Sequence, residues 1–125
     1  MKPFAIAFIA ISFFSGPCKK PDRFFTPFIA PSPIALDGIQ AVFAKDIPYD
    51  GFSETKFDIF LPQASGPAPL VIFFHGGGFT GGDKKDVYEQ DKGKAEIQAL
   101  LSKGIAFASV NYRLLAQIGE TEGVR

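Results

Sequence analysis

The chain has 125 residues, and its 13 basic and 13 acidic residues leave a formal net charge of zero at pH 7. A nucleic-acid-binding protein needs a clustered positive surface, whereas the basic residues of this chain are scattered among acidic ones, so we expect no nucleic-acid partner. The length allows one domain at most.

The N-terminus has the pattern of an export signal. Lys2 precedes the largely apolar run Phe4–Phe14, which is shorter than the about 20 residues that span a bilayer and is typical of a secretory signal. The segment "SGPC" then ends at Cys18, the single cysteine, which cannot form an internal disulfide. This arrangement resembles a bacterial lipoprotein signal, in which that cysteine is lipidated; the alternative is an ordinary signal with an incidental thiol. We predict a signal peptide over residues 1–18 and an exported protein, periplasmic, in the cell envelope or secreted, whose only membrane contact is a lipid anchor.

The next segment is rich in proline, with Pro21, Pro27, Pro31 and Pro33 close together. Proline fixes φ and removes a backbone donor, which favours an extended tether. We therefore predict a linker over residues 19–38, whose phenylalanines are alternatively docked on the body of the protein. The folded part is predicted to be a partial domain over residues 39–125.

Two β-prone segments follow and predict an antiparallel hairpin. The first is Gln40–Tyr49, and the pair Asp50-Gly51 after it is a strong turn signal. The second is "KFDIFLP", which alternates with period two: Phe57, Ile59 and Leu61 lie on one face and Asp58 and Phe60 on the other.

The remaining elements predict a parallel βαβ unit. Leu70–Phe74, "LVIFF", is continuously apolar, which indicates a strand buried on both faces. Lys94–Lys103 has helical spacing of apolar residues and is followed by Gly104, a natural helix stop. Ile105–Tyr112 is a second strand of the buried kind, and a right-handed crossover follows.

A glycine-rich stretch, "HGGGFTGGDKK", follows the first of these strands and predicts a backbone that lies against a ligand. Its last part mixes Lys84 and Lys85 with Asp83 and Asp86, which we interpret as a solvated loop. A phosphate-binding P-loop is excluded, because Gly82 or Asp83 stands where that motif requires lysine.

A dinucleotide fingerprint is met literally by Gly76, Gly78 and Gly81. That fold needs a helix opening at the glycines and an acidic residue about 20 positions later. Leu101 stands at that position, and the predicted helix starts about ten residues after the glycines. Nucleotide binding by the βαβ unit therefore stays the weaker alternative.

The third interpretation is an oxyanion hole, in which backbone N–H groups stabilise the negative oxygen of a tetrahedral intermediate. "HGGGF" after an apolar strand, with "SVNYRL" about thirty residues later, resembles the HGGG motif and the following strand of α/β-hydrolases, in particular the carboxylesterase and feruloyl-esterase-like group. The resemblance implies the N-terminal part of an α/β-hydrolase sheet, a small ester or acyl substrate and no cofactor. The single histidine and single cysteine lie far apart in the sequence, which argues against a metal site. It implies oxyanion donors at Gly76, Gly77 and Gly78, a pocket residue at Phe79, and a loop-orienting rather than basic role for His75.

The catalytic triad of that family is absent from this chain. No serine lies in a G-x-S-x-G frame; Ser53 comes nearest but precedes the glycines. We therefore expect roughly the first third of an exported serine ester hydrolase, inactive and poorly stable alone. The alternative is a non-catalytic exported remnant or binding module.

Overall fold

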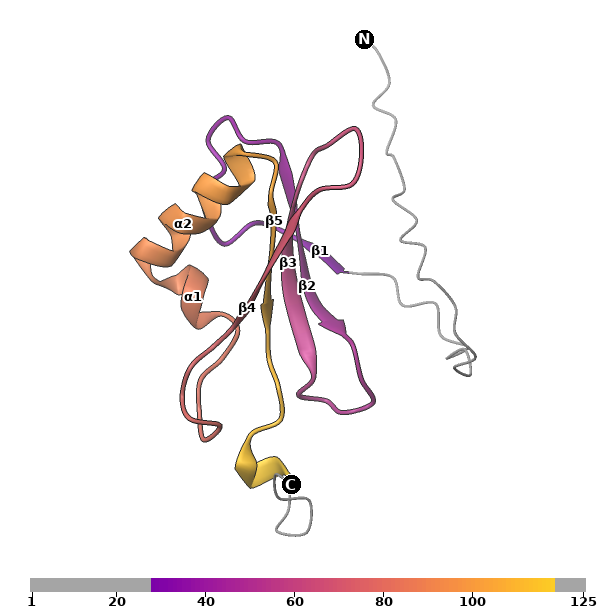
Figure 1. Cartoon of the computed structure of the whole chain (residues 1–125), viewed down its shortest axis with the longest axis vertical. Coiled ribbons are helices and arrows are strands. Elements are labelled where there is room, and N and C mark those ends of the chain that lie inside the picture. Colours follow the sequence, from indigo (N-terminus) through magenta and orange to yellow (C-terminus); the bar gives the residue numbers. More distant parts are fainter. Residues whose placement is uncertain (1–27, 119–125) are drawn as a thin grey trace.

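The computed structural model describes residues 28–118, which form one mixed sheet with helices on one of its faces (Figure 1). The strands lie side by side in the order β1-β2-β3-β5-β4. The elements are β1 (Phe28–Ala30), β2 (Ala41–Pro48), β3 (Lys56–Pro62), β4 (Leu70–Phe74), α1 (Asp86–Glu89), α2 (Asp91–Ser102), β5 (Ala106–Val110) and the 3₁₀ helix η1 (Leu115–Gln117). The predicted signal peptide and Cys18 lie outside the described residues. None of the helices described is long and apolar enough to cross a membrane.

The predicted hairpin is confirmed. Strands β2 and β3 pair antiparallel, with Ala41 opposite Pro62 and Ala44 opposite Ile59. The register shifts between Ala44 and Ile47, which is a β-bulge, and Asp46 in this bulge has a left-handed backbone with φ of 57°. Such a conformation costs of order 1–3 kcal/mol in a non-glycine residue, so other contacts must hold the bulge in place.

The predicted βαβ unit is also confirmed, because β4 and β5 pair in parallel. The helical part begins earlier than expected: α1 starts at Asp86 and α2 at Asp91, not at Lys94. Gly104 ends α2 as expected, with φ of 72° and its N–H 2.9 Å from the carbonyl oxygen of Leu101. The last carbonyl groups of α2 thereby accept hydrogen bonds from the chain that leads into β5.

The prediction that "LVIFF" is buried on both faces is wrong. Strand β4 lies at the edge of the sheet, and Leu70, Ile72 and Phe74 are 49%, 53% and 60% exposed. Strand β5 takes the inner position instead, and all five of its residues are buried. A continuous apolar run fits either position, and the order of the strands decides which run is enclosed.

The folded part begins before the expected Ile39. Residues 28–30, inside the predicted linker, form β1 and pair with β2. Ile34 is only 4% exposed, and the Gln98 side chain of α2 donates a 2.6 Å hydrogen bond to the Ala35 carbonyl. Residues 28–38 therefore pack on the body of the protein, which is the alternative to a free linker.

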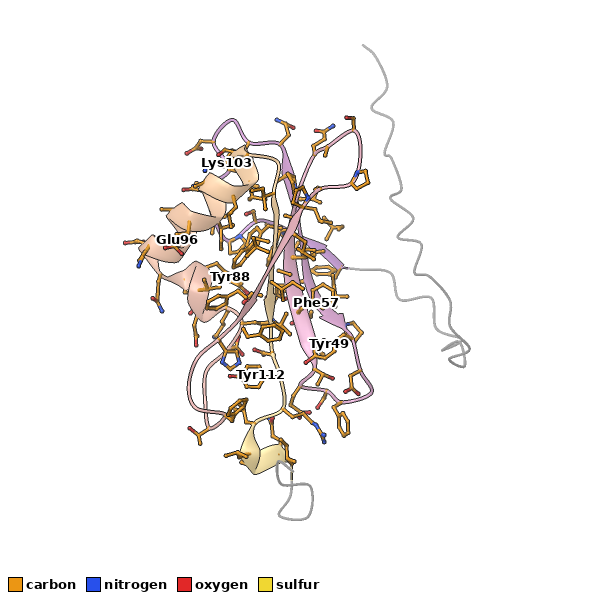
Figure 2. The ribbon with its side chains drawn as sticks, viewed as in Figure 1. Tyr49, Phe57, Tyr88, Glu96, Lys103 and Tyr112 are labelled. Atoms are coloured by element: carbon orange, nitrogen blue, oxygen red, sulfur yellow. The ribbon has the colours of Figure 1, made fainter. Side chains whose placement is uncertain are left out.

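The core lies between the helices and one face of the sheet. Phe43 of β2 and Phe60 of β3 pack with tilted rings whose centroids lie 4.6 Å apart, and Tyr88 of α1 meets Phe60 edge-on at 5.8 Å. The buried cluster consists of Ile34, Phe43, Phe60, Tyr88, Ile97, Leu101 and Phe107. Figure 2 shows Tyr88 on the side of α1 that faces the sheet, while Glu96 of α2 and Lys103, directly after α2, lie on the outer side.

Candidate active site

The candidate site is built on the glycine loop, which we define as residues 75–84. This loop leaves the carboxyl end of β4 and returns toward α1 (Figure 1). Because β4 and β5 run parallel, residues 111–118 leave β5 at the same end of the sheet. Figure 2 shows Tyr112 at that end. The parallel pairing therefore brings the two predicted motifs, "HGGGF" and "NYRL", together.

Two glycines allow the two halves of the loop to touch. Gly77 has φ of 118°, and a Cβ there would collide with the carbonyl oxygen of Gly81. Gly82 has φ of 101°, and a Cβ there would collide with the imidazole of His75. Only glycine combines these backbone angles with such close approach, which explains the composition of the loop better than local flexibility does.

The first turn of the loop leaves backbone donors available. Among the residues that the structure describes, no acceptor takes the N–H of Gly76, Gly77 or Gly78. The carbonyl of Gly77, in contrast, accepts from the backbone N–H of Thr80 at 3.0 Å and from its hydroxyl at 2.8 Å. The turn is thus fixed through its carbonyl groups while its N–H groups remain free for a ligand.

His75 is held tightly at the start of the loop and is only 6% exposed. Its Nδ1 lies 2.7 Å from the Gly76 carbonyl oxygen, so this nitrogen carries the proton and donates. Its ring stacks on Tyr112 with centroids 4.4 Å apart, and the Tyr112 hydroxyl donates to the His75 carbonyl at 2.7 Å. These contacts bear on the predicted loop-orienting role, which stays a prediction.

Phe79 lies at the tip of the loop in a left-handed conformation, with φ of 62° and a side chain that is 60% exposed. Its carbonyl accepts the N–H of Leu115 at 2.8 Å, and its ring meets Tyr112 edge-on at 5.6 Å. Strained backbone of this kind persists where surrounding contacts impose it, which is common at ligand sites.

Lys84 closes the loop and is almost fully buried, at 5% exposed. Its Nζ lies 2.9 Å from Asp46 in the β2 bulge and 2.9 Å from Asp58 in β3. Asp58 is completely buried and also accepts the Tyr88 hydroxyl at 2.7 Å. The prediction of a solvated charged segment is therefore wrong for Lys84, because two strands far away in the sequence supply its counter-charges.

The charges of this cluster are set by competition between burial and pairing. Burial raises the pKa of Asp46, but the hydrogen bond and charge of Lys84 outweigh it, so that pKa lies below its ordinary value. Burial lowers the pKa of Lys84, but hydrogen bonds to Asp58 and Asp46 outweigh it, so that pKa is raised. Burial and the Asp58 carboxylate raise the pKa of Tyr88. At neutral pH, Lys84 and Asp46 are therefore charged and Tyr88 is a neutral donor.

Two cavities flank the loop. One, of about 530 Å³, is lined by Phe74, His75, Phe79, Tyr112, Arg113, Leu115 and Ile118. The other, of about 440 Å³, is lined by Gly76, Gly77 and Gly82 on one side and by residues of α1 and α2 on the other. Hence Phe79 and the predicted donors Gly76 and Gly77 line different cavities, His75 lines both, and Gly78 lines neither.

The residues that hold the loop could not be recognised from the sequence. Ser109 and Asn111 both lie within "SVNYRL" and bond to the main chain of Lys84, but the motif by itself gave no sign of these bonds, and Asp58 was assigned only a face of its strand. The period-two pattern contained one usable signal, since Asp58 shares a face with the core residue Phe60. The side chains of Ser53, Ser102 and Ser109 bond to Glu54, Ala99 and Lys84, respectively, and not to His75.

The part of the chain that contains the glycine loop is similar to known proteins. The family model BD-FAE matches residues 57–121. A kynurenine formamidase of Danio rerio is 33% identical over 70 residues, which cover 55% of this chain and 22% of that protein. A solved bacterial heroin esterase matches with a TM-score of 0.43 and 28% identity, over 65% of this chain and 24% of that one. The chain thus spans about a quarter, or less, of the length of these relatives.

Proposed function

The chain belongs to the BD-FAE family of esterase-like α/β-hydrolases, and from this premise we propose that its glycine loop is the oxyanion hole of a serine hydrolase acting on carboxylic esters or related acyl compounds. The observation that carries the proposal is the set of backbone N–H groups at Gly76, Gly77 and Gly78, which donate to no acceptor within residues 28–118. We place the nucleophile, the acid and the base in sequence beyond Arg125, so the 125-residue chain has no turnover of its own.

The chemistry follows from where negative charge develops. Attack on an acyl carbon moves an electron pair onto the carbonyl oxygen, and that oxyanion needs donors already in position. Gly76 and Gly77 follow a strand whose pairing with β5 fixes their direction, and Tyr112 holds the carbonyl just before them. Such donors act without reorganisation during the reaction, and removing one costs about 10²–10³ in kcat.

The apolar side of the substrate has a suitable place beside the loop. The cavity of about 530 Å³ is lined mainly by aromatic and aliphatic side chains, with Phe79 on the loop itself. Pockets of this kind bind the apolar part of a small ligand, while a few polar groups fix its orientation. We assign the acyl or alcohol group of the substrate to this cavity, with the reacting carbonyl beside His75, which this cavity shares with the one that Gly76 and Gly77 line.

Nucleotide binding has less support. A dinucleotide needs free N–H groups where the glycines meet a helix. At that point the N–H of Asp83 donates to Asp86 at 2.9 Å, and the N–H of Lys85 donates to Asp83 at 2.9 Å. The donors are occupied by carboxylates, whose negative charge repels phosphate.

The first experiment is to sequence the gene past the codon for Arg125, and to assay hydrolysis of p-nitrophenyl acetate by the 125-residue chain and by the longer product. We expect a G-x-S-x-G, an acidic residue and a histidine downstream, with turnover in the longer product only. A stop codon directly after Arg125, turnover by the short chain, or a folded but inactive longer product contradicts the proposal.

A matched pair of variants of the longer product tests the loop itself. Gly77→Ala collides with Gly81 and should lower kcat about 10²–10³-fold. Gly66→Ala introduces the same methyl group at a position with no atom within 4 Å and serves as the control. Equal activity of the two variants would remove the glycine loop from the mechanism.

We also propose export, with Cys18 as a lipid-attachment site. The support is the sequence of residues 1–18. Labelling of cells with radioactive palmitate should mark the chain, and Cys18→Ser should abolish the label. Recovery of the unprocessed chain in the cytoplasm would contradict export.

A further inference from the structure

We propose that Lys84 is a positioning residue for the oxyanion loop. Its buried ammonium group, held between Asp46 and Asp58, fixes residues 81–84 and, through them, the direction of the Gly76 and Gly77 N–H groups. The inference rests on the proposed function, because it concerns the same loop, but its test does not require turnover.

The charge of Lys84 is enclosed by two carboxylates. The ammonium group lies 2.9 Å from one oxygen of Asp46 and 2.9 Å from one oxygen of Asp58. Asp58 also accepts the Tyr88 hydroxyl and the Asp46 backbone N–H, while Asp46 has a longer contact of 3.7 Å with Lys45. The cluster therefore joins the glycine loop to β2, β3 and α1 at once.

The main chain of Lys84 is held as well. Its N–H donates to the Asn111 side chain at 2.6 Å, and its carbonyl accepts the Ser109 hydroxyl at 2.6 Å. Asn111 is itself fixed, because its N–H donates to the Lys56 carbonyl at 2.8 Å. The side chain of Lys84 is thus bound to β2 and β3, and its backbone is bound to β5 and to Asn111, which directly follows β5.

The two halves of the glycine loop are in direct contact. The α-carbon of Gly82 lies so close to His75 and Gly76 that a methyl group has no room there, and Gly77 meets Gly81 in the same way. A packed interface of this kind does not deform continuously. Residues 81–84 therefore cannot move without displacing residues 75–77, which carry the free donors.

A charged side chain at position 84 does something that an apolar one cannot. Enclosing an ammonium between carboxylates has a large desolvation cost, and an apolar side chain of similar size often serves stability equally well. An ionic cluster instead fixes direction, because it is stable only while the ammonium remains within reach of both carboxylates. The geometry thus suits a group that sets the position of a loop.

The test measures backbone order in the 125-residue chain by ¹⁵N relaxation. We expect order parameters of about 0.85 for the Gly76 and Gly77 amides in the wild type, and of less than about 0.6 in Lys84→Met. Amides in the central strand β5, such as that of Ala108, should keep their wild-type values. Lys84→Arg retains a cation for both carboxylates and should restore the order of the loop. Lys103→Met removes an exposed lysine and is the matched control.

The outcomes separate positioning from mere stabilisation. Wild-type order at Gly76 and Gly77 in Lys84→Met overturns the proposal, and so does an equal loss of order in the loop and in β5. If Lys84→Met does not fold, Asp46→Asn decides, because it retains the buried pair with Asp58. It should lower order at the two glycines alone, and unchanged order there overturns the proposal. Failure of the hydrolase assay leaves these measurements unaffected, so the two proposals fail independently.

Discussion

The hydroxyl of Tyr112 donates a 2.7 Å hydrogen bond to the carbonyl of His75, across 37 positions of the sequence. It joins the segment after β5 to the first residue of the glycine loop. The same Tyr112 ring stacks on the imidazole of His75 at 4.4 Å. Together with the Lys84 cluster at the other end, this bond holds the loop at both of its ends.

Removing that hydroxyl should destabilise the chain modestly. Tyr112→Phe keeps the ring stacking but leaves the His75 carbonyl without this donor, and we expect the free energy of unfolding to fall by about 0.5–1.5 kcal/mol. Urea unfolding of the chain measures the change. Tyr49→Phe is the matched control, since the Tyr49 hydroxyl also donates to a backbone carbonyl, that of Asn111, at 2.7 Å, but at an exposed position. A larger loss in the control would contradict the assigned role of Tyr112.

Lys84 and Asp58 should behave as a coupled buried pair. Lys84→Met leaves the fully buried Asp58 without its cation, and we expect a loss of about 3–5 kcal/mol in the free energy of unfolding. The double variant that adds Asp58→Asn should recover part of this loss, because the uncompensated charge is gone. The four proteins form a thermodynamic cycle by urea unfolding, and strict additivity would show that the two side chains do not interact.

Acid should weaken the pairing of Lys84 with Asp46. The pKa of Asp46 is lowered in the folded state from its ordinary value of 3.8, because the charge and hydrogen bond of Lys84 outweigh burial, with smaller contributions from Lys45 and Lys56. A lowered pKa means that the stabilisation is fully present above pH 3.8 and is lost as the pH falls through the folded-state value.

This prediction is checked by measuring the free energy of unfolding of wild type and Asp46→Asn between about pH 2 and pH 7. Carboxylates titrate within this range. The advantage of the wild type should be constant at the upper end and should shrink in the acid range. A difference that grows as the pH falls would have the wrong sign for a lowered pKa.

Strand β4 should make the isolated chain prone to aggregation. It is an edge strand with large apolar side chains exposed, and such edges pair with other chains. Ile72→Lys places a charge on this edge and should raise the soluble concentration, as measured by light scattering after ultracentrifugation. Val42→Lys is the control, because Val42 is 47% exposed but lies in β2, which has neighbours on both sides. Equal gains from both variants would assign the effect to net charge instead of the edge.

Local patterns predicted the elements of the fold well. The alternation in "KFDIFLP" and the turn at Asp50-Gly51 predicted the hairpin, and the pattern of strand, helix, Gly104 and strand predicted the parallel pair, both of which the structure confirms. Periodicity and turn chemistry act within a few residues, so they can be recognised in one dimension. Helix α1 was not predicted, because a short charged helix has too few apolar residues to show the helical period.

For the site, the sequence by itself determined which residues form the glycine loop and which family motif they resemble. Both can be read directly from the chain, as the glycines Gly77 and Gly82 and their spacing to Tyr112. Only the tertiary structure decided that Lys84 is buried, that "LVIFF" lies at an edge, and that Ser109, Asn111 and Asp58 hold the loop. A lysine looks the same in a sequence whether its charge faces solvent or a buried carboxylate. An apolar strand likewise looks the same whether it lies in the centre or at the edge of a sheet. The partners that settle both questions come from strands that are distant in the chain and meet only when the sheet forms.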